Sequence, residues 1–433
     1  MNENWYERLL PRAASSQDPR TPLAVDYARV IHSSSFRRLA GKTQIHSGDS
    51  DIPRTRLTHS LEVSQIALGI AQRLQAQMIV APIEKNTDGL APGIEALFAD
   101  PFIWQIVGLC HDLGHPCGSH AGEEALNSCL PYEGNGQTLR ILTKLESHTA
   151  EFGLNLTRRS LLGILKYPIS YTEASDGPTP PPRRGISGIP LIGPEHLPPK
   201  CFLDSEEPVV EWLFAGIDVD YAFIKAERMK SFDAQLMDLA DDFAYSVADL
   251  DDAIALSMMK PDWLAADVPA NAWKGFVEHH NAYLTGATRK PITDHRQVVS
   301  LLMSGSQTRR AITGSIVNYF LANVRMSVNE EMTDPLYRYR VSIAPQAAHL
   351  MDLLKKCVYD RVICSPKVQQ ERVRTQRMII DLYDAMTYQP LRYLPERHRE
   401  LFVASGEDNR VVADYIAGMT DRFLETTHQR LIG

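Results

Sequence analysis

The chain has 433 residues, of which 44% are hydrophobic and 23% charged, as in ordinary folded globular proteins. This length corresponds to roughly two or three domains and is sufficient for a large core. The formal net charge of −8 argues against a protein whose main task is to coat nucleic acid, although it leaves room for a local basic groove. No apolar run is long enough to span a membrane, and the N-terminus lacks the apolar core of a signal peptide. The six cysteines include no CxxC pair and are expected to be free thiols, so we predict a cytoplasmic protein without a membrane segment.

Helical periodicity dominates the chain. Apolar residues recur at helical spacing after residues 56 and 102, again over 236–256, and near the C-terminus over 374–386 and 411–431. Alternating strand patterns are scarce, so the sequence predicts an all-α fold. The segment 171–208 is the exception, because its many prolines and glycines cannot support a long helix. We expect a long surface loop there.

One stretch, CHDLGHPCGSHAGEE at 110–124, concentrates groups that bind metals or transfer protons. His111 continues the inward stripe of the helix that begins near residue 102, and Asp112 follows it directly. Together they offer one imidazole nitrogen and one carboxylate oxygen to a metal ion. Gly114 and Pro116 then end this helix.

A second helix is predicted to begin after this break, on SHAGEEALNSCL. Ser119 is the expected N-cap residue. His120 and Glu123 then lie three residues apart on one helix face. In that arrangement the carboxylate fixes the tautomer of the imidazole and stabilises its charged form. The pair is either a general acid with its partner or a salt bridge at the start of a helix.

Further metal ligands must come from other helices. His59 lies near the inward stripe of the helix that opens with RTRLTHSLEVSQIA. The helix over 236–256 carries an acidic face, opposite its apolar face, made of Asp238, Asp241, Tyr245, Asp249 and Asp252. Each feature also has an ordinary interpretation, because a lone histidine is usually a hydrogen-bonded core residue, an acidic face is usually solvated, and Cys117 is more readily a small buried thiol than a ligand. Spacing alone therefore suggests a His/His/Asp/Asp metal site and does not establish it.

Six ordered blocks resemble a known family. They are RRLAGKTQ, RTRLTHSLEVSQIA, HDLGHPCGSHAGEEAL, EGNGQTLRILTKLE, LKYPIS and ADDFAYSVADLDDA. In this order they look like the deoxyguanosinetriphosphate triphosphohydrolases, a dNTPase branch of the HD-domain phosphohydrolases. The resemblance is strong over about residues 25–260 and looser towards the C-terminus. It implies an HD catalytic core made of residues 1–170 and 209–300, interrupted by the loop at 171–208 and followed by a C-terminal helical region at 301–433.

The resemblance also implies a divalent metal ion, such as Mn²⁺ or Mg²⁺. Its ligands would be His59, His111, Asp112 and Asp241. In the family a ligand, a tyrosine and a second aspartate follow one another at four-residue steps. That register selects Asp241 rather than Asp242, and it continues with Tyr245 and Asp249.

The remaining site residues are carried over from the same motifs. His115 and His120 would face the phosphates, with His120 as general acid, oriented by Glu123, or alternatively as a nucleophile. Arg56 and Lys166 would hold the triphosphate, Tyr167 would also bind the substrate, and Gln44, Tyr245 and Asp249 would surround the deoxyribose. Asn135, Gln137 and Arg140 belong to a family block whose role is assigned less firmly. The implied reaction cleaves a dNTP between the 5′ oxygen and the α-phosphorus, releasing a deoxynucleoside and inorganic triphosphate.

Two other functions remain open from the sequence. One is an HD phosphohydrolase that acts on another nucleotide, and the other is a regulatory HD protein that binds nucleotides or single-stranded DNA. The family implies a homo-oligomer, with a nucleotide effector or single-stranded DNA as a further partner. One departure concerns the turn before His120, where the family usually reads Pro-Pro-Phe-Gly-His and this chain reads Pro116-Cys117-Gly118-Ser119-His120.

Overall fold

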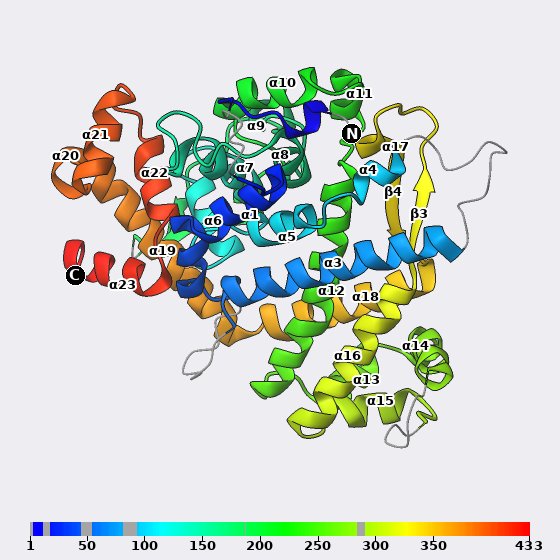
Figure 1. Ribbon diagram of the computed structural model, residues 1–433. Helices are drawn as coiled ribbons and strands as arrows, with labels where there is room; N and C mark the ends of the chain where they lie inside the picture. Colours follow the sequence, from blue (N-terminus) through cyan, green and yellow to red (C-terminus); the bar gives the residue numbers. More distant parts are fainter. Residues whose placement is uncertain (1–2, 12–17, 45–53, 81–92, 187, 284–290) are drawn as a thin grey trace.

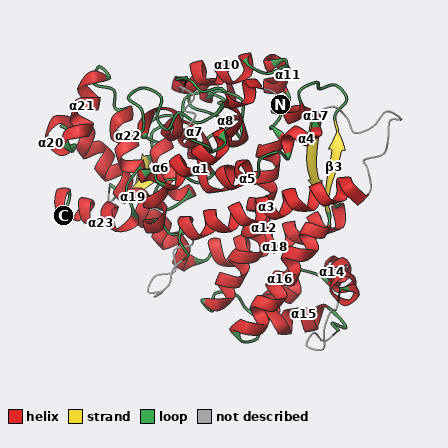
Figure 2. Cartoon of the chain, in the orientation of Figure 1, coloured by secondary structure: helices red, strands yellow, loops and turns green. Residues whose placement is uncertain are grey.

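The computed structural model describes residues 3–11, 18–44, 54–80, 93–186, 188–283 and 291–433. Helices make up most of this part of the chain, and the longest of them cross at the centre of the molecule (Figure 1). Figure 2 shows how little strand accompanies them. The predicted all-α class is therefore confirmed. None of the helices in the described ranges has the length and apolarity needed to cross a membrane.

The elements follow one another in this order. Up to residue 174 the helices are α1 (Pro22–Ile31), α2 (Ser34–Arg38), α3 (Arg56–Val80), α4 (Ile94–Leu97), α5 (Phe102–Cys110), α6 (His120–Asn127), α7 (Gly134–Arg140), α8 (Arg158–Ile164) and α9 (Tyr171–Ala174). Next come α10 (Glu207–Ala215), α11 (Tyr221–Ala226), α12 (Phe232–Ala255), α13 (Pro261–Asp267), α14 (Ala270–Ala282), α15 (His295–Leu302) and α16 (Ser306–Ala322). The C-terminal helices are α17 (Pro335–Arg338), α18 (Pro345–Val358), α19 (Pro366–Tyr388), α20 (Pro390–Tyr393), α21 (Glu396–Ala404), α22 (Arg410–Ala417) and α23 (Asp421–Leu431).

Strands occur as two antiparallel pairs within the described residues. The pairs are β1 (Arg183–Arg184) with β2 (Pro190–Leu191), and β3 (Val324–Val328) with β4 (Tyr339–Ile343). The second pair had no counterpart in the sequence prediction. Its strands are only five residues long, and a pattern that short is weak evidence for a strand.

Helices α3, α5 and α12 form the centre of the main core, where each packs against the other two. Helix α5 is buried on nearly all sides, and this explains why its sequence is almost entirely apolar. Helix α12 begins where the hydroxyl of Ser231 accepts a hydrogen bond from the backbone N–H of Ala234, as an N-cap does. Its apolar face, including Leu236, Phe243 and Val247, is buried against the other helices. Its acidic face is thereby turned towards the beginning of α3.

The crossing of α3 and α5 is unusually close at Gly108. A Cβ atom on Gly108 would lie 2.5 Å from the Cα of Ser64 and 2.6 Å from its nitrogen, so only glycine fits. The backbone carbonyl of Gly108 also accepts a hydrogen bond from Nδ1 of His111, at 2.7 Å. This contact fixes the relation between the start of α3 and the residues that follow α5.

A second core lies in the C-terminal region. It is built mainly from α19, α21, α22 and α23, but it also includes Cys117, Ala125, Leu126 and Tyr132 from the segment around α6. The helix that carries His120 and Glu123 thus packs on α19, and does not belong to the main core alone. Figure 1 shows α6 between the central helices and the C-terminal ones.

The segment 171–208 has only short elements before α10 begins at Glu207. It is not confined to the surface, because His196, Cys201, Phe202 and Leu203 are buried. The backbone carbonyl of His196 accepts a hydrogen bond from Asn127 at the end of α6, at 3.0 Å. The segment therefore contacts the end of α6.

The close crossing predicts a specific sensitivity to added volume. Gly108→Ala should lower the free energy of unfolding by about 1–3 kcal/mol, because the new methyl group meets backbone that cannot move freely. Gly314→Ala is the matched control, since a Cβ at Gly314 in α16 meets no atom within 4 Å. That control should leave the stability unchanged or raise it by up to about 1 kcal/mol. Urea titration of both variants is the measurement, and equal stabilities would contradict the close crossing.

Candidate active site

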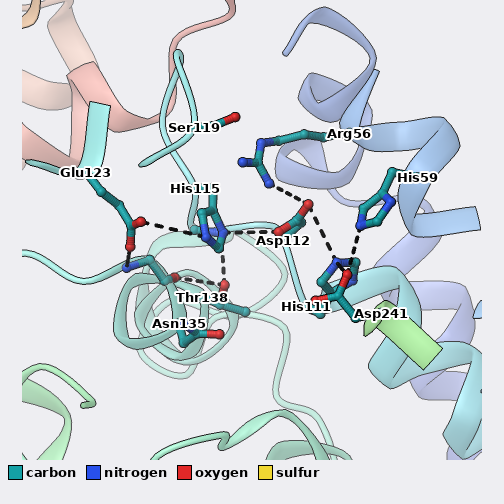
Figure 3. Close-up of polar contacts among 12 residues, drawn as sticks. Arg56, His59, His111, Asp112, His115, Ser119, Glu123, Asn135, Thr138 and Asp241 are labelled. Carbon is teal, nitrogen blue, oxygen red and sulfur yellow. Dashed lines mark hydrogen bonds and ion pairs between the residues drawn. The ribbon is translucent and has the colours of Figure 1, made fainter. Parts of the chain in front are cut away.

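Three helices bring His59, His111 and Asp241 together (Figure 3). His59 lies in the first turn of α3, His111 directly follows α5, and Asp241 lies on the acidic face of α12. Nε2 of His59 is 3.0 Å from Oδ1 of Asp241, and Nε2 of His111 is 3.7 Å from the same oxygen. One potential ligand atom from each residue lies within 4.8 Å of the other two.

Asp112 links this group to its neighbours. Its Oδ2 is 3.6 Å from Nε2 of His111 and forms an ion pair with Arg56, while its Oδ1 is 3.2 Å from Nδ1 of His115. Burial favours the neutral acid, but Arg56 and the surrounding histidines hold the pKa of Asp112 well below its ordinary value. Asp112 is therefore an ionised carboxylate, and its Oδ2 is paired with the cation of Arg56.

His59, His111 and Asp241 fit a divalent cation, and Asp112 lies next to this group through its contact with His111. Because Nδ1 of His111 contacts the carbonyl of Gly108, its Nε2 faces the carboxylates of Asp112 and Asp241, and it has no hydrogen bond within the described residues. The separations of 3.0–3.7 Å are close to the spacing of about 3.0–3.4 Å between neighbouring ligands of an ion bound at about 2.1 Å. Burial lowers the pKa of His59, but the hydrogen bond to Asp241 and the charges of the nearby carboxylates together outweigh it and raise the pKa to about 8. A cation at this site would therefore replace a proton.

The ligand register also agrees with the local contacts. Asp242, the alternative to Asp241, points to the other side of α12 and forms an ion pair of 2.9 Å with Lys355 of α18. Burial and the charges of Asp241 and Asp238 oppose that of Lys355 and leave the pKa of Asp242 raised. Asp242 is thus engaged outside the His/Asp group.

A second polar group lies beside the first. Nδ1 of His120 is 2.7 Å from Oε2 of Glu123, and Oε1 of Glu123 accepts a hydrogen bond of 2.7 Å from the backbone N–H of Gly134. Glu123 is buried, whereas the side chain of His120 is 65% exposed. Despite burial, the neighbouring imidazoles of His115 and His120 and the hydrogen bond from His120 hold the pKa of Glu123 below its ordinary value. His120 therefore presents its free edge to solvent while a buried carboxylate orients it.

His115 lies between the two groups. Its Nε2 is 4.0 Å from Oε2 of Glu123, and its ring centre is 5.7 Å from that of His120. Burial and the charge of Arg56 lower the pKa of His115 to about 3, so the imidazole is neutral at physiological pH. A neutral ring at this place can donate or accept a hydrogen bond without repelling a cation at the neighbouring group.

Cationic side chains line a further part of the region. Nζ of Lys166 is 2.6 Å from Oδ1 of Asp238, and Lys230 pairs with the other oxygen of the same carboxylate. Lys230 also lies over the ring of Tyr167, 5.2 Å from its centre. Against the effect of burial, Asp238 and Asp241 raise the pKa of Lys166, which remains charged. Two ammonium groups thus share one carboxylate.

Two of the predicted sugar-binding residues, Tyr245 and Asp249, follow Asp241 along α12. Asp249 is buried, and burial raises its pKa to about 7 against the opposing charges of His59 and Arg54. Burial and Asp249 likewise raise the pKa of Tyr245 above its ordinary value. Gln44 pairs its backbone N–H with the carbonyl of Arg54 at 3.0 Å.

Not every residue of the family blocks reaches this region. Gln137 and Arg140 both bind Asp414 of α22, and Arg140 also binds Glu206. Asn135 donates to Glu133 at 2.7 Å. Gln137 and Arg140 therefore connect the core to the C-terminal region and do not enter the His/Asp group.

Two predictions about the turn between α5 and α6 have different outcomes. The expected N-cap by the side chain of Ser119 is wrong, because its hydroxyl makes no capping hydrogen bond and its backbone has a φ of 55° and a ψ of −130°. Cys117 is a buried thiol, as expected, and its Sγ donates to the carbonyl of Met419 at 2.9 Å. All six cysteines are free, also as expected.

One residue of the region was missed. Lys42 is buried, and its Nζ donates to the backbone carbonyls of His115 at 2.7 Å and Ala417 at 3.0 Å. Burial lowers the pKa of Lys42 to about 8. Its place in the block RRLAGKTQ was a signal, but nothing in the local sequence distinguishes a buried lysine from an exposed one.

Comparisons with known proteins agree with this geometry. Residues 56–161 match the HD domain, and residues 341–430 match the phosphohydrolase-associated domain. The chain is 35% identical to a deoxyguanosinetriphosphate triphosphohydrolase-like protein of Shewanella loihica, over 99% of this chain and 96% of the relative. It is 36% identical to deoxyguanosinetriphosphate triphosphohydrolase-like protein 2 of Deinococcus radiodurans, over 98% of this chain and 95% of the relative. The chain therefore belongs to the HD-domain deoxyguanosinetriphosphate triphosphohydrolase family, the family that its sequence blocks resemble.

Proposed function

We propose that the protein hydrolyses deoxynucleoside triphosphates to a deoxynucleoside and inorganic triphosphate, using a divalent cation. The observation that carries the proposal is the placement of His59, His111 and Asp241 within 4.8 Å of one another, beside an exposed His120 that a buried Glu123 orients. Cation ligands and a proton donor are the two requirements for cleaving a phosphate ester with an alkoxide leaving group. The names of the relatives support the substrate class.

His59, His111, Asp112 and Asp241 would hold the cation. When bound, such an ion supplies Lewis acidity to phosphate oxygens and lowers the pKa of a water molecule. The chain itself compensates the fourth ligand, since Arg56 pairs with Asp112. His111 is fixed in the tautomer with Nδ1 protonated, because that nitrogen contacts the carbonyl of Gly108.

His120 is the proposed general acid. Nδ1–H donates to Glu123, so Nε2 is the atom that faces the substrate and delivers a proton to the departing 5′ oxygen. Glu123 is itself held by the N–H of Gly134, which keeps the carboxylate in place while the charge on the imidazole changes. Neutral His115 would donate a hydrogen bond to a phosphate oxygen.

The remaining groups would select and hold the nucleotide. Arg56, Lys166 and Tyr167 face the triphosphate in this proposal, since a substrate with about four negative charges needs several cations. Gln44, Tyr245 and Asp249 contact the deoxyribose. With a pKa of about 7, Asp249 can either donate or accept a hydrogen bond at a sugar hydroxyl.

The products distinguish this function from the alternatives. Incubation with each of the four dNTPs and Mn²⁺ or Mg²⁺ should release deoxynucleoside and triphosphate in equal amounts, because cleavage occurs at the α-phosphorus. Chromatography of the phosphate species is the measurement, with the ribonucleotides as controls for sugar selection. Orthophosphate or pyrophosphate as the first product would favour an HD phosphohydrolase of another kind, and binding without any turnover would favour a regulatory protein.

The ligand assignment predicts different effects for two adjacent aspartates. Asp241→Asn should lose most of its bound cation and nearly all turnover, because it removes a charged ligand shared with both histidines. Asp242→Asn is the matched control, and it should keep both, since it disturbs only the pair with Lys355. Metal analysis of the two folded variants checks this assignment. A full metal content in Asp241→Asn together with an empty Asp242→Asn would reverse the register.

The proton-donor assignment predicts loss of turnover without loss of metal. His120→Ala should keep its cation and lose roughly 10²–10⁴-fold in kcat, the usual effect of removing a general acid. Glu123→Gln should lose less, because the amide oxygen still accepts a hydrogen bond from the imidazole. His428→Ala is a matched control, since His428 also contacts a carboxylate, Asp381, at 3.1 Å but lies in the C-terminal region. Near-normal turnover of His120→Ala would limit the His120–Glu123 pair to a structural role.

A further inference from the structure

Ser119 has a backbone conformation that serine rarely adopts. Its φ is 55°, where a Cβ atom is crowded and glycine is favoured. The family pattern Pro-Pro-Phe-Gly-His has glycine at this place, directly before the histidine. This chain therefore keeps a side chain where the backbone favours none.

Contacts from distant parts of the chain impose this conformation. On one side of Ser119, Cys117 donates to the carbonyl of Met419, and the carbonyl of His115 accepts from Lys42. Gly118 has a φ of 72°, and a Cβ there would lie 2.5 Å from Cγ2 of Thr375 in α19. The turn is thus held at several points, and a strained residue persists only where its surroundings fix it in this way.

The hydroxyl of Ser119 is available for a ligand. It does not cap α6, and within the described part of the chain it donates only to the carbonyl of Gln44, at the long distance of 3.5 Å. The residue is half-buried, and in Figure 3 its hydroxyl points towards the side of the site where Arg56 lies. It thus lies near Gln44 and immediately before His120, the proposed sugar ligand and proton donor.

We propose that Ser119 is a substrate-binding residue whose hydroxyl donates a hydrogen bond to a phosphate oxygen of the nucleotide. The inference rests on the proposed function and adds a contact that the family motif, with glycine, does not supply. A charged phosphate oxygen is a stronger acceptor than the carbonyl of Gln44, so the hydroxyl gains by turning to the substrate. The strain at Ser119 is then the consequence of placing this donor beside His120.

Two substitutions separate the hydroxyl from the backbone. Ser119→Ala removes the hydroxyl and keeps the strained Cβ, whereas Ser119→Gly removes both. Each should raise the Kd for inorganic triphosphate, measured by calorimetry with Mg²⁺ present, by roughly tenfold or more, and lower kcat/KM for a dNTP to a similar extent. Ser119→Gly should nevertheless have a Tm about 1–3 °C above that of Ser119→Ala, because it relieves the strain.

Ser128→Ala is the matched control, since Ser128 follows the same helix and its hydroxyl contacts the carbonyl of Ala125 and the sulfur of Cys129. It should leave the triphosphate affinity and kcat/KM unchanged. The proposal is overturned if wild type binds no triphosphate, if Ser119→Ala binds it like wild type, or if only Ser119→Gly is impaired. The binding measurement does not need turnover, so a wild-type protein that binds triphosphate but cleaves no dNTP would refute the proposed function and leave this inference standing.

Discussion

The close crossing of α3 and α5 at Gly108 is the constraint on which the site depends. Ser64 of α3 lies against Gly108, five residues after His59, and His111 comes three residues after Gly108. A single contact between the two helices therefore positions both histidines. Each histidine lies only a few residues from that contact, so its place relative to the other is narrowly fixed. The same glycine fixes the ring of His111 through its carbonyl. Helix α12 then needs to supply only the carboxylate of Asp241.

The C-terminal region provides the second support. Asp421 accepts hydrogen bonds from both the backbone N–H and the hydroxyl of Thr43, each at 2.8 Å, next to Gln44. Glu124, the neighbour of Glu123 on α6, is held by Arg372 at 2.9 Å and by Gln376 at 2.8 Å, both from α19. These contacts fix the segments on both sides of His120. The phosphohydrolase-associated region is therefore part of the site's construction, because the turn before α6 and the residues around Gln44 would otherwise lack fixed positions.

The local sequence correctly predicted the helices and the residues that share a helix face, because periodicity and spacing determine both. His59, His111 and Asp241 lie on helices that the apolar pattern located, and a four-residue step on α12 is sufficient to place Asp241, Tyr245 and Asp249 on one face. The choice between these residues and ordinary core or surface groups came from the resemblance, because spacing within one helix does not say which helices meet.

What the sequence could not predict depends on contacts between distant residues. The N-cap expected at Ser119 follows local preference, but the contacts of Cys117 and Gly118 with residues of the C-terminal region impose another conformation. Lys42 was missed for the same reason, since its contact with Ala417 joins residues 375 positions apart. In both cases a tertiary contact decides the structure. It either overrides the local preference or leaves no signal in the local sequence.

The charges of the site explain how an acidic chain can accept a polyanion. Asp112 already has a cationic partner in Arg56. Asp241 accepts a hydrogen bond from protonated His59, and a bound cation would displace that proton. The proposed divalent ion would therefore give the ligands and Arg56 a positive net charge, which would attract phosphate. Lys166 and Lys230 share the single carboxylate of Asp238, so together they also carry one uncompensated positive charge. In a chain with a net charge of −8, the proposed cation and these lysines would supply local positive charge of the sign that the proposed substrate requires.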